Sequence, residues 1–102
     1  MVHVIATIDI APGKRDEYLE LFAQLVPKVQ AEQGCLAYGP ALDIDSGISV
    51  QIPLRENVVT AVEQWASLEE LQAHLTAPHM GEYKDAVKDI VVGLTLQVLQ
   101  PV

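Results

Sequence analysis

The sequence predicts an α+β protein with the ferredoxin-like order β-α-β-β-α-β, in which an antiparallel sheet carries both helices on one face. Three observations lead to this fold class. Apolar residues alternate over residues 2–10, apolar residues then recur at helical spacing from residue 14, and the same two patterns reappear in the second half of the chain. At 102 residues the chain forms a single domain, 1–102.

The first strand and the first helix are the clearest elements. Residues 2–10 place one set of apolar side chains on one face and a half-apolar set on the other, and Pro12 with Gly13 ends the strand. The helix that follows has an apolar stripe made of Tyr18, Phe22, Leu25 and Val29. Pro27 is expected to kink this helix or to split it near residue 26.

The middle of the chain contains two strands and an ambiguous segment. Residues 35–44 read as a strand, broken or bulged at Gly39-Pro40. Residues 48–57 alternate in hydrophobicity but contain Pro53, which favours either an edge strand or an extended loop. Residues 58–65 form a clearer strand, with Glu63 and Trp65 on the same face.

The second helix is predicted to be broken. Ser67 with Glu70 forms a capping box, so a helix starts at Leu68. Its apolar stripe is expected to contain Leu68, Leu71 and Leu75. Pro78 begins a second helical piece that continues to Ile90 and ends at Gly93, and residues 94–99 form the last strand.

Composition limits the partners of this domain. Half of the residues are hydrophobic, and the net charge of −8 argues against nucleic acid or an anionic membrane as a ligand. No signal peptide or membrane-spanning run is recognised, so a cytoplasmic location is expected. Because no element remains to cover the second face of the sheet, we predict a homodimer through that face.

Several motifs together resemble the antibiotic biosynthesis monooxygenase family. They are Gly13 after the first strand, EQGCLAY at residues 32–38, EQW at 63–65 and HLTAPHM at 74–80. The resemblance implies a dimeric α/β barrel with a cavity between each sheet and its own helices. Its members include cofactor-free quinol and polyketide monooxygenases, haem-degrading enzymes and an isomerase, so the fold alone does not fix the reaction.

The sequence departs from members of that family in two respects, one that concerns haem-degrading members and one that concerns polyketide oxygenases. Haem-degrading members resemble one another in an asparagine on the first strand, where this chain has Ala6 or Thr7, and in a late helical histidine, near which it has Glu82 and Tyr83. Haem degradation is therefore disfavoured. Some polyketide oxygenases carry an asparagine before the tryptophan, at the position of Ala61.

His74 and His79 are the candidate catalytic residues. His74 borders the leucine stripe, where it is either a core-edge histidine or a base that accepts a phenolic proton. His79 follows a proline at a helix start, where it either caps backbone groups or reaches a ligand. The two are five residues apart and would not share a helix face, and no third ligand is evident nearby, so no metal site is predicted.

Trp65, Glu63 and Tyr83 are the candidate substrate-binding residues. Trp65 is either a core anchor or an indole that stacks on a flat aromatic substrate. Glu63 shares its face and needs a partner or a shifted pKa, with His74 or a backbone amide as the expected partner. Tyr83 lies on the stripe of the last helical piece, where core packing is the more common role.

The function predicted first is a cofactor-independent monooxygenase that oxidises a small aromatic quinol or polyketide-type phenol with O₂. The resemblance suggests the reaction, and the sequence contains neither a glycine-rich nucleotide loop nor a convincing metal cluster, so no cofactor is expected. Two alternatives stay open: a dimer without catalytic activity that binds a small molecule or serves in stress, and a cofactor-free isomerase of a small carbonyl compound.

Overall fold

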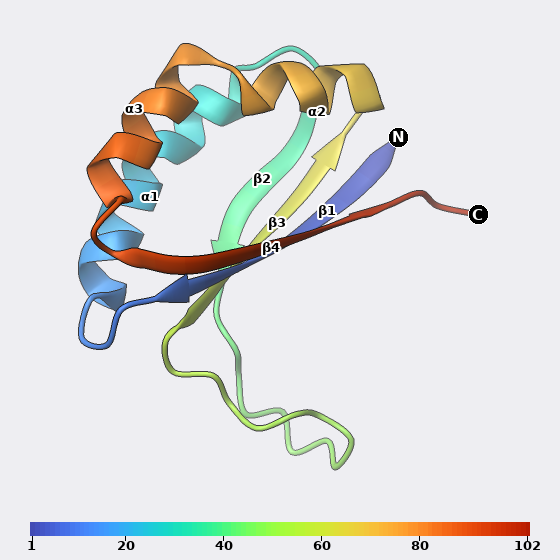
Figure 1. Cartoon of the computed structure of the whole chain (residues 1–102). Helices are drawn as coiled ribbons and strands as arrows, with labels where there is room; N and C mark the ends of the chain where they lie inside the picture. The colour runs from blue at the N-terminus through green and yellow to red at the C-terminus, as the bar shows by residue number, and fades with distance from the viewer.

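Four strands and three helices make up the protein, whose computed structural model describes residues 1–102. Their order is β1 (Val2–Ile10), α1 (Arg15–Gln30), β2 (Cys35–Ala41), β3 (Val58–Trp65), α2 (Leu68–Leu75), α3 (Pro78–Val87) and β4 (Val91–Leu99). The strands form one antiparallel sheet in the order β2-β3-β1-β4, and the helices lie together on one face of it (Figure 1). The predicted fold class is confirmed. None of the helices combines the length and apolar character that crossing a membrane requires.

The core lies between the sheet and α1. The inward residues of β1 are Val4, Ala6, Ile8 and Ile10, and each is at most 5% exposed. The predicted stripe of α1 packs onto them, since Tyr18, Phe22, Leu25 and Val29 are all buried. Two-residue periodicity in the strand and helical periodicity in α1 therefore converge on the same apolar layer.

Of the two effects predicted for Pro27, a kink or a split of α1, the split is not observed. The helix continues through Pro27 to Gln30. Pro27 lies in the last turn and lacks the N–H that would donate to the carbonyl of Ala23. Its own carbonyl still accepts from the backbone N–H of Ala31 at 3.2 Å, so the helix continues past it.

The predicted details of β2 and β4 also need correction. The second strand ends at Ala41 rather than at residue 44, and its register shifts between Cys35 and Ala37 rather than at Gly39-Pro40. Likewise, β4 starts at Val91, so Gly93 lies within a strand and does not end a helix. Gly93 pairs with Asp9, where a Cβ would come within 2.8 Å of the Asp9 carboxylate.

The stripe of α2 differs from the predicted row of leucines. Leu71 and His74 are its buried residues, whereas Leu68 is 48% and Leu75 is 40% exposed. Ser67 caps the helix by accepting from the backbone N–H of Glu70 at 3.2 Å. The reciprocal half of the capping box is missing, because the Glu70 Oε2 atom is buried without a partner.

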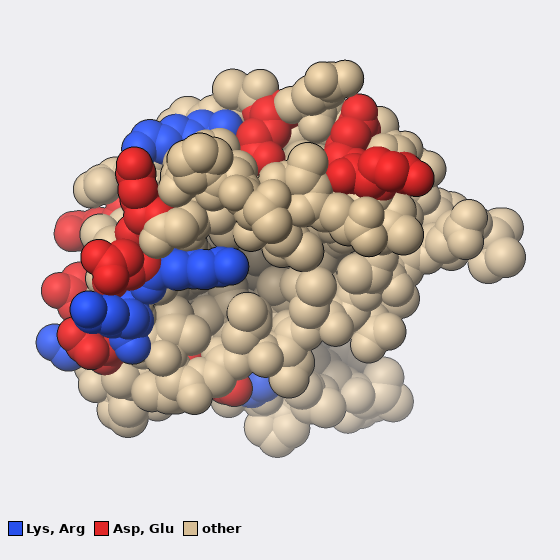
Figure 2. Space-filling model, turned by 45° about the horizontal axis from the view of Figure 1, so that its top comes forward, with Lys and Arg blue, Asp and Glu red and all other residues tan.

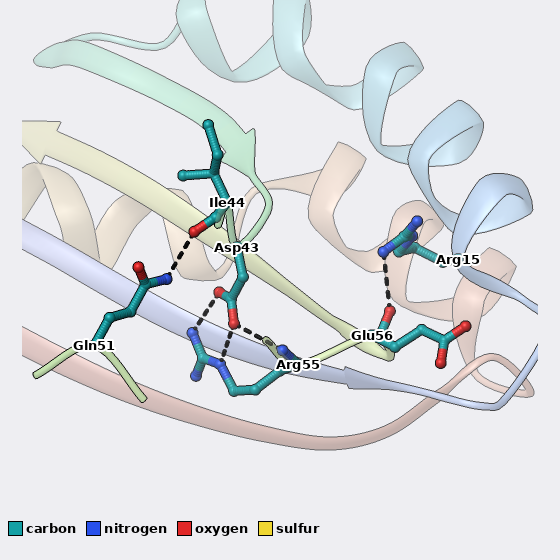
Figure 3. Close-up of polar contacts among 6 residues, drawn as sticks. All are labelled: Arg15, Asp43, Ile44, Gln51, Arg55 and Glu56. Carbon is teal, nitrogen blue, oxygen red and sulfur yellow. Dashed lines mark hydrogen bonds and ion pairs between the residues drawn. The ribbon is translucent and has the colours of Figure 1, made fainter. Parts of the chain in front are cut away.

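Residues 42–57 form a long loop that extends beyond the sheet (Figure 1). Of the two structures that the sequence left open here, the extended loop is therefore observed. Two hydrogen bonds from the Arg55 guanidinium to Asp43, each 2.9 Å long, join the two ends of the loop (Figure 3). These bonds hold the pKa of Asp43 down at about 2. At the β3 end Arg15 donates to the Glu56 carbonyl at 3.1 Å (Figure 3).

Gly34 lies in the turn that joins α1 to β2, and we expect its replacement to reduce the stability of the protein. Its φ is +82°, and an added Cβ would lie 2.8 Å from the Glu70 Cβ. We expect Gly34→Ala to lower the free energy of unfolding by more than the ~1–2 kcal/mol that a left-handed conformation alone costs an L residue.

Gly13→Ala is the matched control, because Gly13 has a φ of +80° but no atom within 4 Å of the added Cβ. Urea denaturation of both variants measures the difference. An equal loss of stability in the two variants would mean that the contact with Glu70 is relieved without cost.

Candidate functional site

A pocket of about 360 Å³ lies between the sheet and the helices, within the range of small-molecule sites. Twelve of its sixteen lining residues are hydrophobic, among them Phe22, Met80 and Leu96. The space-filling view shows a hollow in this side of the molecule, with mostly uncharged atoms around it and a basic side chain that projects over it (Figure 2). The four other lining residues are Glu63, His74, Lys84 and Lys88.

Glu32 connects the two histidines predicted to be catalytic. It lies in the turn after α1, and its Oε2 atom is 2.8 Å from Nδ1 of His74 and 2.7 Å from Nε2 of His79. An ionised carboxylate can only accept hydrogen bonds, so each of these ring nitrogens carries the hydrogen. The Glu32 side chain is 13% exposed, which shields both hydrogen bonds from much of the solvent.

His74 is held in one orientation within the core. His74 is 2% exposed. The centroid of its ring lies 4.7 Å from that of the Trp65 ring and 5.6 Å from that of the Tyr38 ring, which it meets edge-on. Because Nδ1 donates to Glu32, the neutral ring has its lone pair on Nε2. Nε2 of His74 has no hydrogen-bond partner in the protein. Glu70 Oε2 is the one side-chain nitrogen or oxygen atom that is both fully buried and without a partner, so Nε2 of His74 keeps some access to solvent. His74 lines the pocket, so this basic nitrogen is available to a ligand there.

Glu63 lines the same end of the pocket and is 5% exposed. Its Oε1 atom accepts a 2.9 Å hydrogen bond from Nε1 of Trp65, two residues further along β3. Burial raises the pKa of Glu63 above its usual value, although the Trp65 hydrogen bond and the nearby His74 offset part of that increase. The sequence correctly indicated that this carboxylate needs a partner or a shifted pKa. The predicted partner was His74 or a backbone amide, whereas the observed partner is Trp65.

Three tyrosines surround the pocket wall. Tyr83 lines the pocket, and its hydroxyl is hydrogen-bonded to the hydroxyl of Tyr18. Tyr38 also lines it and stacks on Phe22 with ring centroids 5.5 Å apart. Burial is the main cause that raises the pKa of each of the three phenols. Each therefore keeps its proton at neutral pH, and Tyr38 can donate to an oxygen atom in the pocket.

The predicted site residues occupy three different places. Glu63, His74 and Tyr83 line the pocket, but Trp65 is fully buried and contacts His74, so its indole is not positioned to stack on a ligand. His79 lies outside this pocket, in a smaller one of about 170 Å³ that is lined by α1 and α3 residues including Leu25 and Ala86. The long loop 42–57 contributes no residue to the main pocket.

The cluster of Glu32, His74 and His79 is also the one place suited to a metal ion. Their ligand atoms all lie within 4.8 Å of one another, and two imidazoles with a carboxylate suit zinc and related metals. Glu32 supplies the third ligand that is not evident from the sequence. In this structure the same atoms hydrogen-bond to each other, so the cluster is internally satisfied as it stands.

Sequence reasoning missed Glu32 and Tyr38 as members of the site. Both belong to the segment EQGCLAY at residues 32–38, which marked the junction of α1 with β2 but carried no assigned role. Glu32 is 42 residues from His74 along the chain, so their contact follows only from the packing of that junction against α2.

Comparison with known proteins places the whole chain among related sequences. The family model described as antibiotic biosynthesis monooxygenase matches residues 1–86. The chain is 42% identical to the probable quinol monooxygenase YgiN of Escherichia coli (strain K12) over 103 residues, which cover 99% of this chain and 98% of that protein. YgiN of Shigella flexneri matches with the same identity and coverage.

Solved structures share the fold at lower identity. A conserved protein from Methanosarcina mazei Go1 superposes with a TM-score of 0.83 at 19% identity, covering 99% of this chain and 92% of that one. PA3566 from Pseudomonas aeruginosa gives a TM-score of 0.80 at 23% identity, covering 99% and 93%. These two likenesses concern the fold alone.

Glu63→Gln is expected to stabilise the protein at neutral pH. Because the pKa of Glu63 is raised on folding, ionisation of this carboxyl favours the unfolded chain. The contribution of Glu63 to stability is fully present below its unfolded pKa of ~4.3 and is lost as the pH rises through the higher folded pKa. Glutamine stays neutral and keeps an oxygen to accept from Trp65.

Urea denaturation at pH 4 and pH 7.5 measures this effect. The advantage of Glu63→Gln over the wild type should grow between the two pH values, whereas Glu69→Gln, on the exposed side of α2, should show little change. If the advantage were the same at both pH values, Glu63 would not be the titrating group.

Proposed function

We propose that this chain, which belongs to the antibiotic biosynthesis monooxygenase family, oxidises a small aromatic quinol with O₂ and without a cofactor. The observation behind the proposal is an apolar pocket lined by one imidazole, that of the buried His74, whose Nε2 has no partner in the protein. The identity of 42% with a protein named a probable quinol monooxygenase supports the choice of substrate class.

In this proposal His74 is the catalytic base. The quinol lies in the pocket with one hydroxyl at Nε2 of His74, which takes its proton. Glu32 stabilises the imidazolium that forms, because its carboxylate already accepts from Nδ1 at 2.8 Å. The positive charge on His74 therefore forms next to the Glu32 carboxylate. This pairing lowers the free-energy cost of placing a charge on a side chain that is 2% exposed.

The oxidation itself needs only the deprotonated quinol and O₂. The anion transfers one electron to O₂, and the two radicals combine at a ring carbon that bears a hydrogen. The peroxide formed there takes back the proton held by His74, and the hydrogen on the ring carbon leaves in the next step. Loss of water then leaves a carbonyl at that carbon, so one oxygen atom enters the product and the other leaves as water. The protein contributes the base, the orientation and a pocket with little water.

The other residues of the site have supporting roles. Tyr38 is positioned to donate to the oxygen that becomes negatively charged, and Tyr83 forms an apolar wall whose hydroxyl is already bonded to Tyr18. His79 acts through Glu32 and does not touch the quinol, which makes it a positioning residue. Trp65 has the same kind of role, because its ring packs on His74 and its N–H is bonded to Glu63.

We also propose that the protein works as a homodimer through the sheet face that the helices leave open. Exposed apolar side chains occur on this face and along the adjoining loop, as expected of a surface buried by a partner. They include Leu36, Val62 and Leu99, and in the loop Ile48, Val50 and Ile52. A cytoplasmic location remains a prediction from the sequence.

Oxygen uptake with benzoquinols and reduced naphthoquinones, corrected for autoxidation, tests the reaction. His74→Gln should lower kcat by about 10²- to 10⁴-fold, the usual contribution of a positioned general base. Glu69→Gln, a change on the exposed side of α2 and outside the pocket, should leave kcat unchanged.

The alternatives predict different results from the same experiment. A protein that only binds, or an isomerase, would consume no oxygen with any quinol on the panel. Uptake that survives His74→Gln in a folded protein would keep the oxygenase reaction but exclude His74 as its base.

Light scattering coupled to size-exclusion chromatography tests the dimer. The wild type should have twice the chain mass of 11.1 kDa. Val62→Glu places a charge at the centre of the open face, where the side chain is 43% exposed, and should shift the protein to the monomer mass without unfolding it. A monomeric wild type at 50 μM would contradict the proposal.

A further inference from the structure

We propose that the pocket selects quinols that carry an anionic group, such as a carboxylate, at the end opposite to the oxidised hydroxyl, and that Lys84 and Lys88 recognise this group. The inference rests on the proposed function and adds the substrate class. The distribution of charge around the pocket differs from that of the molecule as a whole.

Acidic residues outnumber basic ones in this chain by fourteen to six, yet the pocket shows the opposite balance. Among its lining residues the only acid is Glu63, whereas two of the four lysines of the chain line it. With a net charge of −8 the protein as a whole repels anions. The two lysines make the opening of the pocket a local positive site that attracts them.

The charges of α3 are divided between two sides of the helix. Lys84 and Lys88 are four residues apart, so they lie on the same side of the helix, together with Val87 in the pocket wall. Glu82, Asp85 and Asp89 do not line the pocket. The helix dipole accounts for basic residues near the C-terminus of α3, but it does not account for their position on the pocket side.

Both lysines are free to bind an anion. Lys84 forms no ion pair with the protein, and Lys88 has only a 3.6 Å contact with Asp85 in which the side chains are 67% and 81% exposed. Such exposed pairs contribute little.

The position of the lysines also fixes which end of the quinol they meet. Met80 and Lys88 both line the pocket and are eight positions apart along α3 and its C-cap, which is about 12 Å along the helix axis. The buried end of the pocket contains His74 and Glu63, where a second anion would be repelled. The anionic group therefore points to the exposed end and the reacting hydroxyl to His74.

A matched pair of ligands tests this inference: a 1,4-naphthoquinol with a propionate side chain and its methyl ester. Calorimetry with the oxidised forms, which cannot turn over, measures binding independently of catalysis. We expect the acid to bind the wild type about three- to tenfold more tightly than the ester at low salt, the range for two exposed ion pairs. The preference should shrink in 0.2 M salt.

Lys84→Gln/Lys88→Gln should abolish the preference and leave ester binding unchanged, whereas Lys14→Gln, outside the pocket, should retain it. Equal binding of acid and ester by the wild type, or a preference that survives in the double variant, would overturn the inference. The protein could prefer the acid through the two lysines and yet consume no oxygen. That result would support the anion site and refute the proposed oxidation. In a working enzyme the same preference should appear in KM and not in kcat.

Discussion

One carboxylate oxygen connects the parts of this molecule that make up the site. Glu32 Oε2 accepts from His74 on α2 and from His79 on α3, while Glu32 itself belongs to the turn between α1 and β2. Hydrogen bonds to charged groups are worth roughly 1.5–3 kcal/mol each, and the low exposure of these three side chains protects them from competing water. The break in the second helical region has a consequence here, because two separately oriented helices can direct two histidines at the same atom.

The fold gives the pocket two chemically different ends. At the buried end, β3 carries Glu63 and Trp65 on its inner face, and the Trp65 ring packs against His74. At the other end, α3 contributes exposed lysines and β4 contributes apolar residues such as Leu94, which is 61% exposed. A planar ligand with one reactive hydroxyl and one charged end matches this arrangement, because each part meets a suitable partner without an unpaired buried charge.

The sequence predicted the elements of this fold better than the contacts of the site. Periodicity located β1, α1 and β3 because burial on one face leaves a regular spacing, as in Val4, Ala6 and Ile8. The starts of α2 and α3 came instead from the Ser67 cap and from Pro78. Periodicity alone could not decide whether Pro27 splits α1, because the effect depends on how close Pro27 lies to the end of the helix. It also could not pair Glu32 with His74, because that contact depends on how the α1–β2 turn packs against α2. Trp65 and His79 were recognised as notable residues, but which side chains face the pocket depends on tertiary packing.

The tautomer of His74 decides whether this residue can act as the base, because a base in the pocket requires a hydrogen on Nδ1 and a lone pair on Nε2. Two-bond ¹H–¹⁵N correlation spectra of the ¹⁵N-labelled protein at pH 8, with His74 assigned through His74→Gln, distinguish the two neutral forms. We predict the Nδ1–H form for His74. The Nε2–H form would place a proton instead of a base in the pocket and would contradict the role given to Glu32 and to His74.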